Sequence, residues 1–292
     1  MATEDAWELA LYRHEPPPGT KPKAVVLCQH AVFTNAASFD FPRGRGLASY
    51  LALKGFVVYR LDFRGHGFSR HRSGARPDFT YDDVGFKDIP AAVEFLRASH
   101  GGLPFFIIGH SLGGNTTTML LSQRPDFPID GLIALGVNVW MPSFEPDAKR
   151  RRQKRWAMTA MNWLTRFLGY FPAKRLGMGS ENLPKGFMRQ WCVWPDQDRW
   201  LSADRRVDYR EDMNRIKMPI LALAGADDWI CPPESTRAFF GQTGGPVEYA
   251  MISRETHGCR RAGHMDLLVG RSMEKAWDEI ARWLEVRLGR PI

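Results

Sequence analysis

The chain has 292 residues, of which 44% are hydrophobic and 25% are charged, and this composition excludes wholesale disorder. The length fits one large α/β domain or two small ones with a substantial core. The formal net charge of +8 favours anionic partners or surfaces and says little about the fold.

The N-terminus and the cysteines bear on the cellular compartment. Residues 1–15 carry acidic side chains among apolar ones and lack a basic region followed by an apolar block, so they do not resemble a signal peptide. No run approaches the length of a membrane span. The four cysteines are scattered without CxxC spacing, which argues against a zinc site and against a disulfide framework. We therefore expect a cytoplasmic protein with reduced thiols.

Apolar runs alternate with helical segments along the first half of the chain. Trp7, Leu9 and Leu11 recur at every second position, which is the period of a half-buried strand, and we expect this strand to open the sheet. The other expected strands span 24–29, 56–61, 105–108 and 129–139, and the expected helices span 47–53 and 82–99. This alternation predicts a mostly parallel α/β sheet with helices on both faces.

The alternation breaks between residues 140 and 214, a region dense in Trp, Met, Arg and Lys and interrupted by prolines such as Pro142 and Pro172. We interpret this region as several short helices inserted over the carboxyl ends of the strands, where open α/β sheets bind ligands. The predicted organisation is therefore a core of residues 1–139 and 215–292 with a helical cap of residues 140–214.

The second half of the core resumes the alternation. We expect strands at 218–224 and 247–252, a helix near 234–240 and a long amphipathic helix at the C-terminus. A loop with two histidines lies before this last helix.

The stretch PFFIIGHSLGG, residues 104–114, contains the pattern G-x-S-x-G after a short apolar strand and before a helical segment. This pattern is typical of a nucleophile elbow, a strained strand-to-helix turn that presents the oxygen of Ser111 above the sheet. Glycine is needed at the flanking positions because larger side chains would clash there. The backbone N–H groups at the start of the following helix suit a developing oxyanion.

A serine hydroxyl needs a base, and the base needs an orienting carboxylate. Candidates for the carboxylate and for the base follow Ser111 in the chain order Ser, Asp, His, which is the order that the elbow pattern predicts. Asp227 and Asp228 compete for the role of the acid, because adjacent side chains in an extended turn cannot both point at one histidine. His257 and His264 compete for the role of the base, and the histidine that is not used is expected to be an ordinary loop residue.

With these motifs, nearly all of the chain except the cap resembles α/β-hydrolase-fold serine hydrolases of the lipase and esterase type. The resemblance implies the α/β-hydrolase fold and supports Asp228 in a G-x-x-D-x-I-x-P turn as the acid and His264 as the base. It also implies that residues 62–69, which resemble a loop frequent in the superfamily, have a structural role.

The resemblance further implies an oxyanion hole in which Val32 and Leu112 each supply a backbone N–H. Members of the superfamily commonly carry His-Gly before the first donor, whereas this chain has His30-Ala31, and a positive φ angle would be costly for alanine. The candidate substrate-binding residues are His30, His110, Trp140 and Trp163. Because the backbone of His110 belongs to the elbow, we expect its ring to pack or hydrogen-bond beneath the site.

The steepest charge run of the chain, residues 149–155, precedes an apolar stripe at helical spacing. The stripe consists of Trp156, Ala160, Trp163, Leu164, Phe167 and Phe171. We expect the stripe to lie over the active-site pocket with the charges in water. The alternatives are a lid that touches an anionic lipid surface and, least favoured, a contact with nucleic acid, for which no binding motif is present.

Together these features predict a serine hydrolase that cleaves an ester or related acyl bond of a hydrophobic small molecule through an acyl-enzyme, without metal or cofactor. The aromatic residues of the cap favour a substrate with a hydrophobic acyl or alcohol part. The alternatives are an acyltransferase, thioesterase or peptidase that uses the same triad and, from another class, a ligand-binding member of the fold without turnover. The partners would be the substrate and, weakly through the basic cap, an anionic membrane surface, with no nucleic acid expected.

Overall fold

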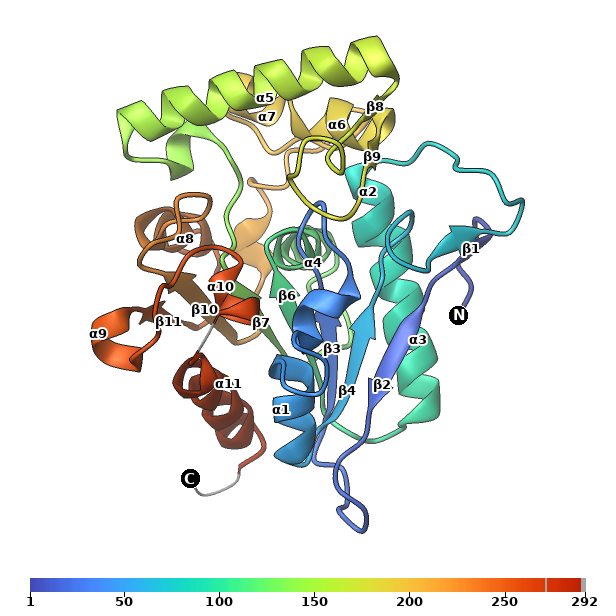
Figure 1. The fold of residues 1–292 in the computed structure, drawn as a ribbon, viewed down its shortest axis with the longest axis vertical. Coiled ribbons are helices and arrows are strands. Elements are labelled where there is room, and N and C mark those ends of the chain that lie inside the picture. Colours follow the sequence, from blue (N-terminus) through green and yellow to red (C-terminus); the bar gives the residue numbers. More distant parts are fainter. Residues whose placement is uncertain (271, 290–292) are drawn as a thin grey trace.

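The computed structural model describes residues 1–270 and 272–289. A seven-stranded sheet forms the centre of this part of the chain, in the order β11-β10-β7-β6-β3-β4-β2 (Figure 1). All neighbouring pairs are parallel except β2 and β4. The predicted fold class, a mostly parallel sheet between helices, is confirmed. The strands are β1 (Trp7–Glu8), β2 (Leu11–His14), β3 (Val25–Gln29), β4 (Val57–Leu61), β5 (Arg70–His71), β6 (Phe105–His110), β7 (Gly131–Leu135), β8 (Tyr170–Phe171), β9 (Leu183–Pro184), β10 (Ile220–Gly225) and β11 (Val247–Ile252).

The helices pack on both faces of the sheet. Residues of α1 and α11 share one hydrophobic cluster with alternate residues of the strands, such as Val26 and Ile108. Residues of α3, α4 and α8 share the other cluster with Leu27 and Ile107. The α-helices are α1 (Leu47–Leu53), α2 (Tyr81–Asp83), α3 (Ile89–Ser99), α4 (Leu112–Gln123), α5 (Ala148–Leu168), α6 (Lys185–Trp191), α7 (Trp194–Gln197), α8 (Pro233–Phe240), α9 (Arg254–His257), α10 (Asp266–Val269) and α11 (Glu274–Arg287).

The predicted first strand is wrong as a single element. β1 pairs with β5 in a separate two-stranded sheet, and only β2 joins the central sheet, at its edge. The interruption has a local cause, because Leu9 bonds back to the carbonyl oxygen of Met1 and Ala10 donates to the hydroxyl of Ser69.

Two other predicted elements differ in extent. The strand predicted for 129–139 is only β7, since the backbone turns at Gly136 with a φ of 55°. The helix predicted for 82–99 consists of α2, a π-helical turn (Val84–Asp88) and α3. Pro90 at the start of α3 has no backbone N–H to donate, which fits this break in the helical hydrogen bonding.

Residues 140–214 contribute no strand to the central sheet, and α5 and α6 lie above the carboxyl ends of its strands (Figure 1). The end of this segment runs down beside α4, where Asp212 accepts from the side chain of Gln123. The prediction of several short helices is corrected here, because one helix, α5, runs for 21 residues. The side chain of Asp147 caps its first turn by accepting from the backbone N–H of Arg150, and Gly169 ends it in the left-handed conformation. None of the described helices is long and apolar enough to cross a membrane.

Candidate active site

The turn after β6 places Ser111 at the carboxyl edge of the sheet. Ser111 has a φ of 49° and a ψ of −107°, which is strained for a residue other than glycine, and α4 begins at the next residue. A Cβ atom on Gly109 would lie 2.3 Å from the backbone nitrogen of Gly114, and one on Gly113 would lie 2.5 Å from Gln29. Close backbone packing therefore requires both glycines and holds the turn.

His264 and Asp228 are joined by a hydrogen bond of 2.8 Å between Nδ1 and Oδ2. The other carboxylate oxygen of Asp228 accepts the backbone N–H groups of Ile230 and Cys231, each at 2.8 Å. Burial alone would raise the pKa of Asp228, but the charge and hydrogen bond of His264 and the two N–H donors lower it overall. Asp228 is thus held as a carboxylate beside the imidazole ring.

The rival residues lie elsewhere. The carboxylate of Asp227 accepts the backbone N–H of Ala262 at 3.0 Å. The ring of His257 bonds to Glu279 at 2.8 Å and to the neighbouring Thr256. Neither residue belongs to the cavity that Ser111 and His264 line. His264 therefore shares a cavity with Ser111 and is hydrogen-bonded to Asp228, whereas neither rival lines that cavity.

A cavity of about 380 Å³ lies beneath α5 and in front of Ser111. Its lining is mainly apolar, with Asn115, Asn138 and Thr34 among its polar members. Val32 and Leu112, the predicted oxyanion donors, both line it, and Leu112 is the first residue of α4, where a backbone N–H has no intrahelical acceptor. The full lining is Ala31, Val32, Phe33, Thr34, Tyr81, Ser111, Leu112, Asn115, Asn138, Trp140, Met161, Gly177, Met178, Gly179, Trp191, Ile230, Cys231, His264 and Met265.

The loop after β3 accommodates Ala31 without a positive φ angle at that residue. Ala31 is not among the residues with positive φ, and the left-handed position of this loop is Phe33, with a φ of 63°. The strained left-handed backbone conformation thus falls on Phe33, whose ring packs against that of Phe171.

Of the four candidate substrate-binding residues, only Trp140 lines the cavity. His30 is fully buried, where its ring accepts from the backbone N–H of Phe63, and burial holds its pKa well below the ordinary value. His110 bonds to the carbonyl oxygen of His264 at 3.0 Å, and burial and the nearby His264 lower its pKa to about 3. Both histidines lie beneath the site as neutral packing groups, which corrects their assignment to substrate binding.

Trp163 does not line the cavity either, so its assignment to substrate binding is also corrected. It is 69% exposed on the outer side of α5, and Trp156 and Phe167 are exposed on the same side. Most of the predicted stripe therefore faces solvent, although Leu164 is half-buried and Phe171 is buried. The expectation that the stripe as a whole covers the pocket is wrong. The buried side of α5 carries instead Lys154, Met158, Met161 and Thr165.

The sequence did not indicate that Lys154 is buried and contacts the loop of Ile230, because this lysine stands within a run of charged residues that was expected to face water. Its side chain is 3% exposed, and its ammonium group bonds to Glu145 at 2.6 Å and to the carbonyl oxygen of Ile230 at 2.8 Å. The rings of Trp140 and Trp229 lie within 6 Å of it. Lys154 shares one helix face with Met158 and Met161, but the aromatic face of α5 has the same helical spacing, so the spacing alone does not indicate which face is buried.

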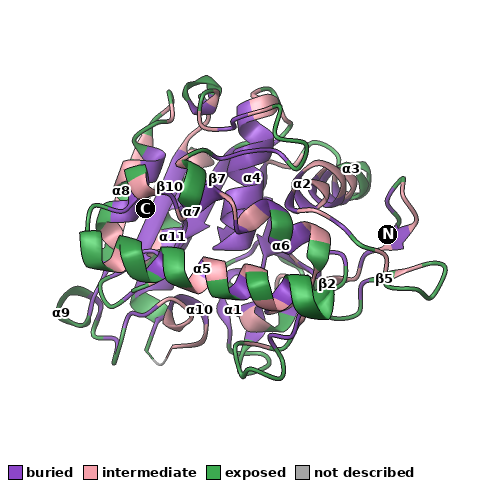
Figure 2. Cartoon of the chain, turned by 90° about the horizontal axis from the view of Figure 1, so that it is seen from above, coloured by how far each residue is buried: buried purple, intermediate pink, exposed green. Residues whose placement is uncertain are grey.

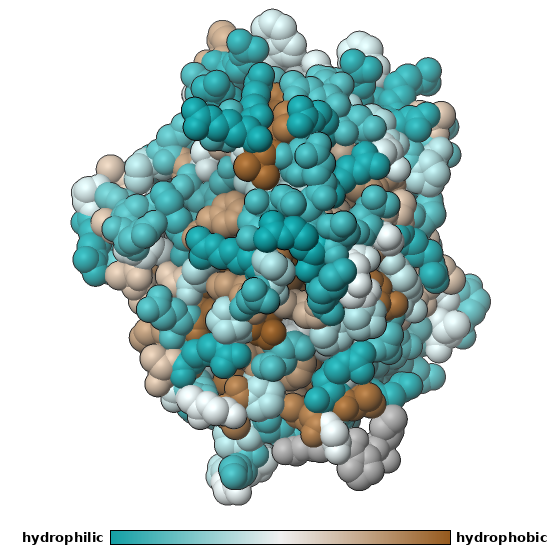
Figure 3. Space-filling model, turned by 180° about the vertical axis from the view of Figure 1, so that it is seen from behind, coloured by the Kyte–Doolittle hydropathy of each residue, from teal (hydrophilic) through white to brown (hydrophobic). Residues whose placement is uncertain are grey.

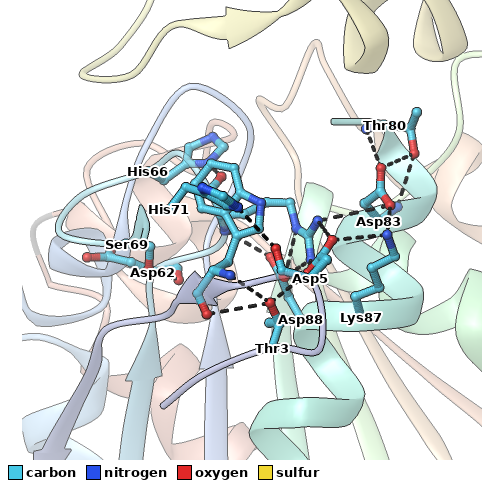
Figure 4. Close-up of polar contacts among 12 residues, drawn as sticks. Thr3, Asp5, Asp62, His66, Ser69, His71, Thr80, Asp83, Lys87 and Asp88 are labelled. Atoms are coloured by element: carbon cyan, nitrogen blue, oxygen red, sulfur yellow. Dashed lines mark hydrogen bonds and ion pairs between the residues drawn. The ribbon is translucent and has the colours of Figure 1, made fainter. Parts of the chain in front are cut away.

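Residues 62–69 form the loop between β4 and β5 and do not line the cavity. Arg64, 1% exposed, bonds to Asp88 at 2.7 Å and to Asp5 at 2.9 Å. Figure 4 shows Asp5, Lys87 and Asp88 close together at this point. The ion pairs tie the N-terminal segment to the helical layer, as a structural role requires.

A nucleophile turn after a central parallel strand, with acid and base on later loops of the same sheet edge, defines an α/β-hydrolase-fold protein. The chain belongs to the family described as serine aminopeptidase, S33, whose model matches residues 20–191. This match includes Ser111 and ends before Asp228 and His264.

Solved structures share the fold over the whole chain. Est1E from Butyrivibrio proteoclasticus with bound ferulic acid is 16% identical with a TM-score of 0.66, and the alignment covers 99% of this chain and 100% of that one. The monoacylglycerol lipase of Paleococcus ferrophilus is 19% identical with a TM-score of 0.61, covering 96% of this chain and 99% of that one.

Curated relatives match a shorter part. Mouse lipase member K is 31% identical over 138 residues, which are 43% of this chain and 34% of that protein. Human monoglyceride lipase is 29% identical over 113 residues, 39% of this chain and 34% of that protein. The matched segment spans about a third of the length of each of these relatives.

Proposed function

We propose that this chain is a serine hydrolase that cleaves a carboxylic ester of a hydrophobic small molecule. The observation that carries the proposal is the Asp228–His264 hydrogen bond beside a cavity that His264 shares with the elbow serine, Ser111. The lipase and esterase names of its relatives favour ester over amide bonds.

In the proposed reaction, the hydroxyl oxygen of Ser111 attacks the ester carbonyl carbon while its proton passes to His264. Asp228 holds Nδ1 of the ring, which leaves Nε2 to accept that proton. The backbone N–H groups of Val32 and Leu112 stabilise the oxyanion. His264 then protonates the departing alcohol, and water, activated by the same ring, releases the acyl group from Ser111.

We also assign residues 140–214 the role of a cap over a core of residues 1–139 and 215–292. This assignment is supported by two residues of the segment, Met161 of α5 and Trp191 of α6, which both line the cavity. The mainly apolar lining favours a substrate with a hydrophobic acyl or alcohol part.

The proposal includes a weak contact with an anionic membrane surface and a location in the cytoplasm. Lys149, Arg151 and Arg152 of the cap are exposed and would attract an anionic membrane surface weakly. The four cysteines are free and buried, which fits the reducing cytoplasm. Recovery of the native protein from a secreted fraction would overturn the cytoplasmic assignment.

The proposed function is tested with p-nitrophenyl esters of increasing acyl length, with amino-acid p-nitroanilides and with an added alcohol acceptor. We expect kcat for ester hydrolysis to fall by about six orders of magnitude in Ser111→Ala. Ser122→Ala, a change in the same helix far from the cavity lining, serves as the control. Full esterase activity in Ser111→Ala would refute the proposal, and cleavage of the anilides alone or dominant transfer to the alcohol would replace it with a peptidase or an acyltransferase.

A further inference from the structure

The outer side of α5 carries three large aromatic side chains that no other part of the described chain covers. Trp156, Trp163 and Phe167 are 71%, 69% and 88% exposed. Their spacings of seven and four residues place them on one stripe of the helix. Figure 1 shows α5 as the outermost element above the sheet, and Figure 2, seen from above, shows exposed residues along it.

Other exposed large hydrophobic side chains of the described chain, such as Leu53 and Phe68, lie on separate elements. On the face seen from behind in Figure 3, hydrophobic side chains occur as patches among hydrophilic ones. Contiguous exposed apolar surface in a globular protein marks a binding surface for a partner.

Basic residues extend the same stripe toward the N-terminal end of the helix. Lys149 and Arg152 lie three and four residues apart ahead of Trp156 and are exposed, without an ion pair to any described residue. Arg166 places its guanidinium 5.9 Å from the ring of Trp163. The sequence of α5 contains neither Asp nor Glu. Its outer side therefore combines aromatic rings with unopposed positive charge.

We propose that this outer side of α5 docks on an anionic lipid surface. Trp156, Trp163 and Phe167 enter the boundary between headgroups and acyl chains, while Lys149 and Arg152 bind anionic headgroups. A second copy of this chain fits less well as the occupant, because two such faces would bring like charges together. The inference extends the proposed function and rests on it for the identity of the substrate.

The inner side of the same helix connects this surface to the cavity. Met161, on the buried side of α5, lines the cavity, and the helix with its side chains is only about 10 Å thick. Met178, in the segment that follows α5, also lines the cavity and is 48% exposed, so an apolar side chain of the lining reaches the surface.

The docking is tested by co-sedimentation with vesicles of phosphatidylcholine alone and with vesicles in which about a third of the lipid is phosphatidylserine. We expect the wild type to bind the anionic vesicles. Trp156→Gln/Phe167→Gln and Lys149→Glu/Arg152→Glu should each weaken this binding about tenfold or more. The control is Phe68→Gln, which removes another ring, 81% exposed, on a different loop and should bind as the wild type does.

Equal binding by the wild type and the aromatic double variant would overturn the docking, as would failure of the wild type to sediment. Concentration-dependent self-association that the same variant abolishes would also overturn it in favour of a second copy. The two proposals fail separately: Ser111→Ala should still bind vesicles, and the aromatic double variant should still hydrolyse dissolved short esters.

Discussion

The turn that carries Ser111 and the helix α5 both reach the cavity, but they are held in different ways. The turn is fixed by its own backbone, since Gly109 and Gly113 leave no room for a Cβ atom. α5 is attached through a few side-chain contacts, of which the buried pair of Lys154 and Glu145 is the most enclosed. In the proposed mechanism the sheet edge supplies the reacting groups, and α5, which is anchored by other contacts, covers the cavity.

α5 also contacts the loop of Asp228 through one residue, Ile230. Lys154 and the indole N–H of Trp140 both donate to the carbonyl oxygen of Ile230, at 2.8 and 3.1 Å. The backbone N–H of Ile230 donates to Asp228. The proposed cap thus contacts the loop of the proposed acid, so we expect contacts within the sheet edge and contacts from α5 to differ in how strongly they affect turnover.

The largest effect is expected within the sheet edge. Asp228→Asn removes the charge that orients His264 and stabilises its protonated form, and we expect kcat on p-nitrophenyl esters to fall by about a thousandfold or more. The matched control is Asp227→Asn, whose carboxylate serves only a backbone N–H, and its kcat should stay within about tenfold of the wild type. Equal losses in the two variants would contradict the assignment of the acid.

A smaller effect is expected where the cap meets the acid loop. Lys154→Met removes the donor to Ile230, and we expect kcat to fall by about ten- to a hundredfold for every acyl length, with KM nearly unchanged, because the acid loop is displaced while the cavity keeps its shape. Lys149→Met, on the exposed side of the same helix, should leave both constants unchanged. A rise in KM alone would mean that Lys154 shapes the cavity and does not support the acid.

The smallest effect concerns stability and pH. Burial alone would raise the pKa of Glu145, but Lys154 and Arg150 lower it overall. Because the folded-state pKa lies below the unfolded one, the stabilisation from Glu145 is present above its ordinary pKa and disappears as the pH falls through the folded value. The difference in unfolding free energy between the wild type and Glu145→Gln should therefore be largest near neutral pH and shrink on acidification. A difference independent of pH would contradict this ion pair.

The sequence was most informative where local geometry dictates residue type. The glycines around Ser111, and the positions of Ser111, Asp228 and His264 after β6, β10 and β11, led to the fold. Two of these residues, Asp228 and His264, are hydrogen-bonded to each other, and His264 shares a cavity with Ser111. The conformation of the loop at Ala31 could not be predicted from the sequence, because the positive φ angle of that loop falls on Phe33.

The orientation of α5 could not be predicted from its periodicity. The stripe through Trp156 and Trp163 has the expected helical spacing, yet a second face through Lys154 and Met158 has the same spacing and is the buried one. Hydrophobicity alone favoured the aromatic face, because a lysine is rarely buried. Only the tertiary contact with Glu145 and Ile230 explains why the basic residue faces inward.

The most direct test of the account identifies the nucleophile chemically. The native protein is treated with a fluorophosphonate, digested and analysed by mass spectrometry to locate the adduct. The account predicts a single adduct on Ser111, formed much more slowly in Asp228→Asn. An unlabelled native protein, or an adduct on another residue, would contradict the claim that the elbow serine is the nucleophile.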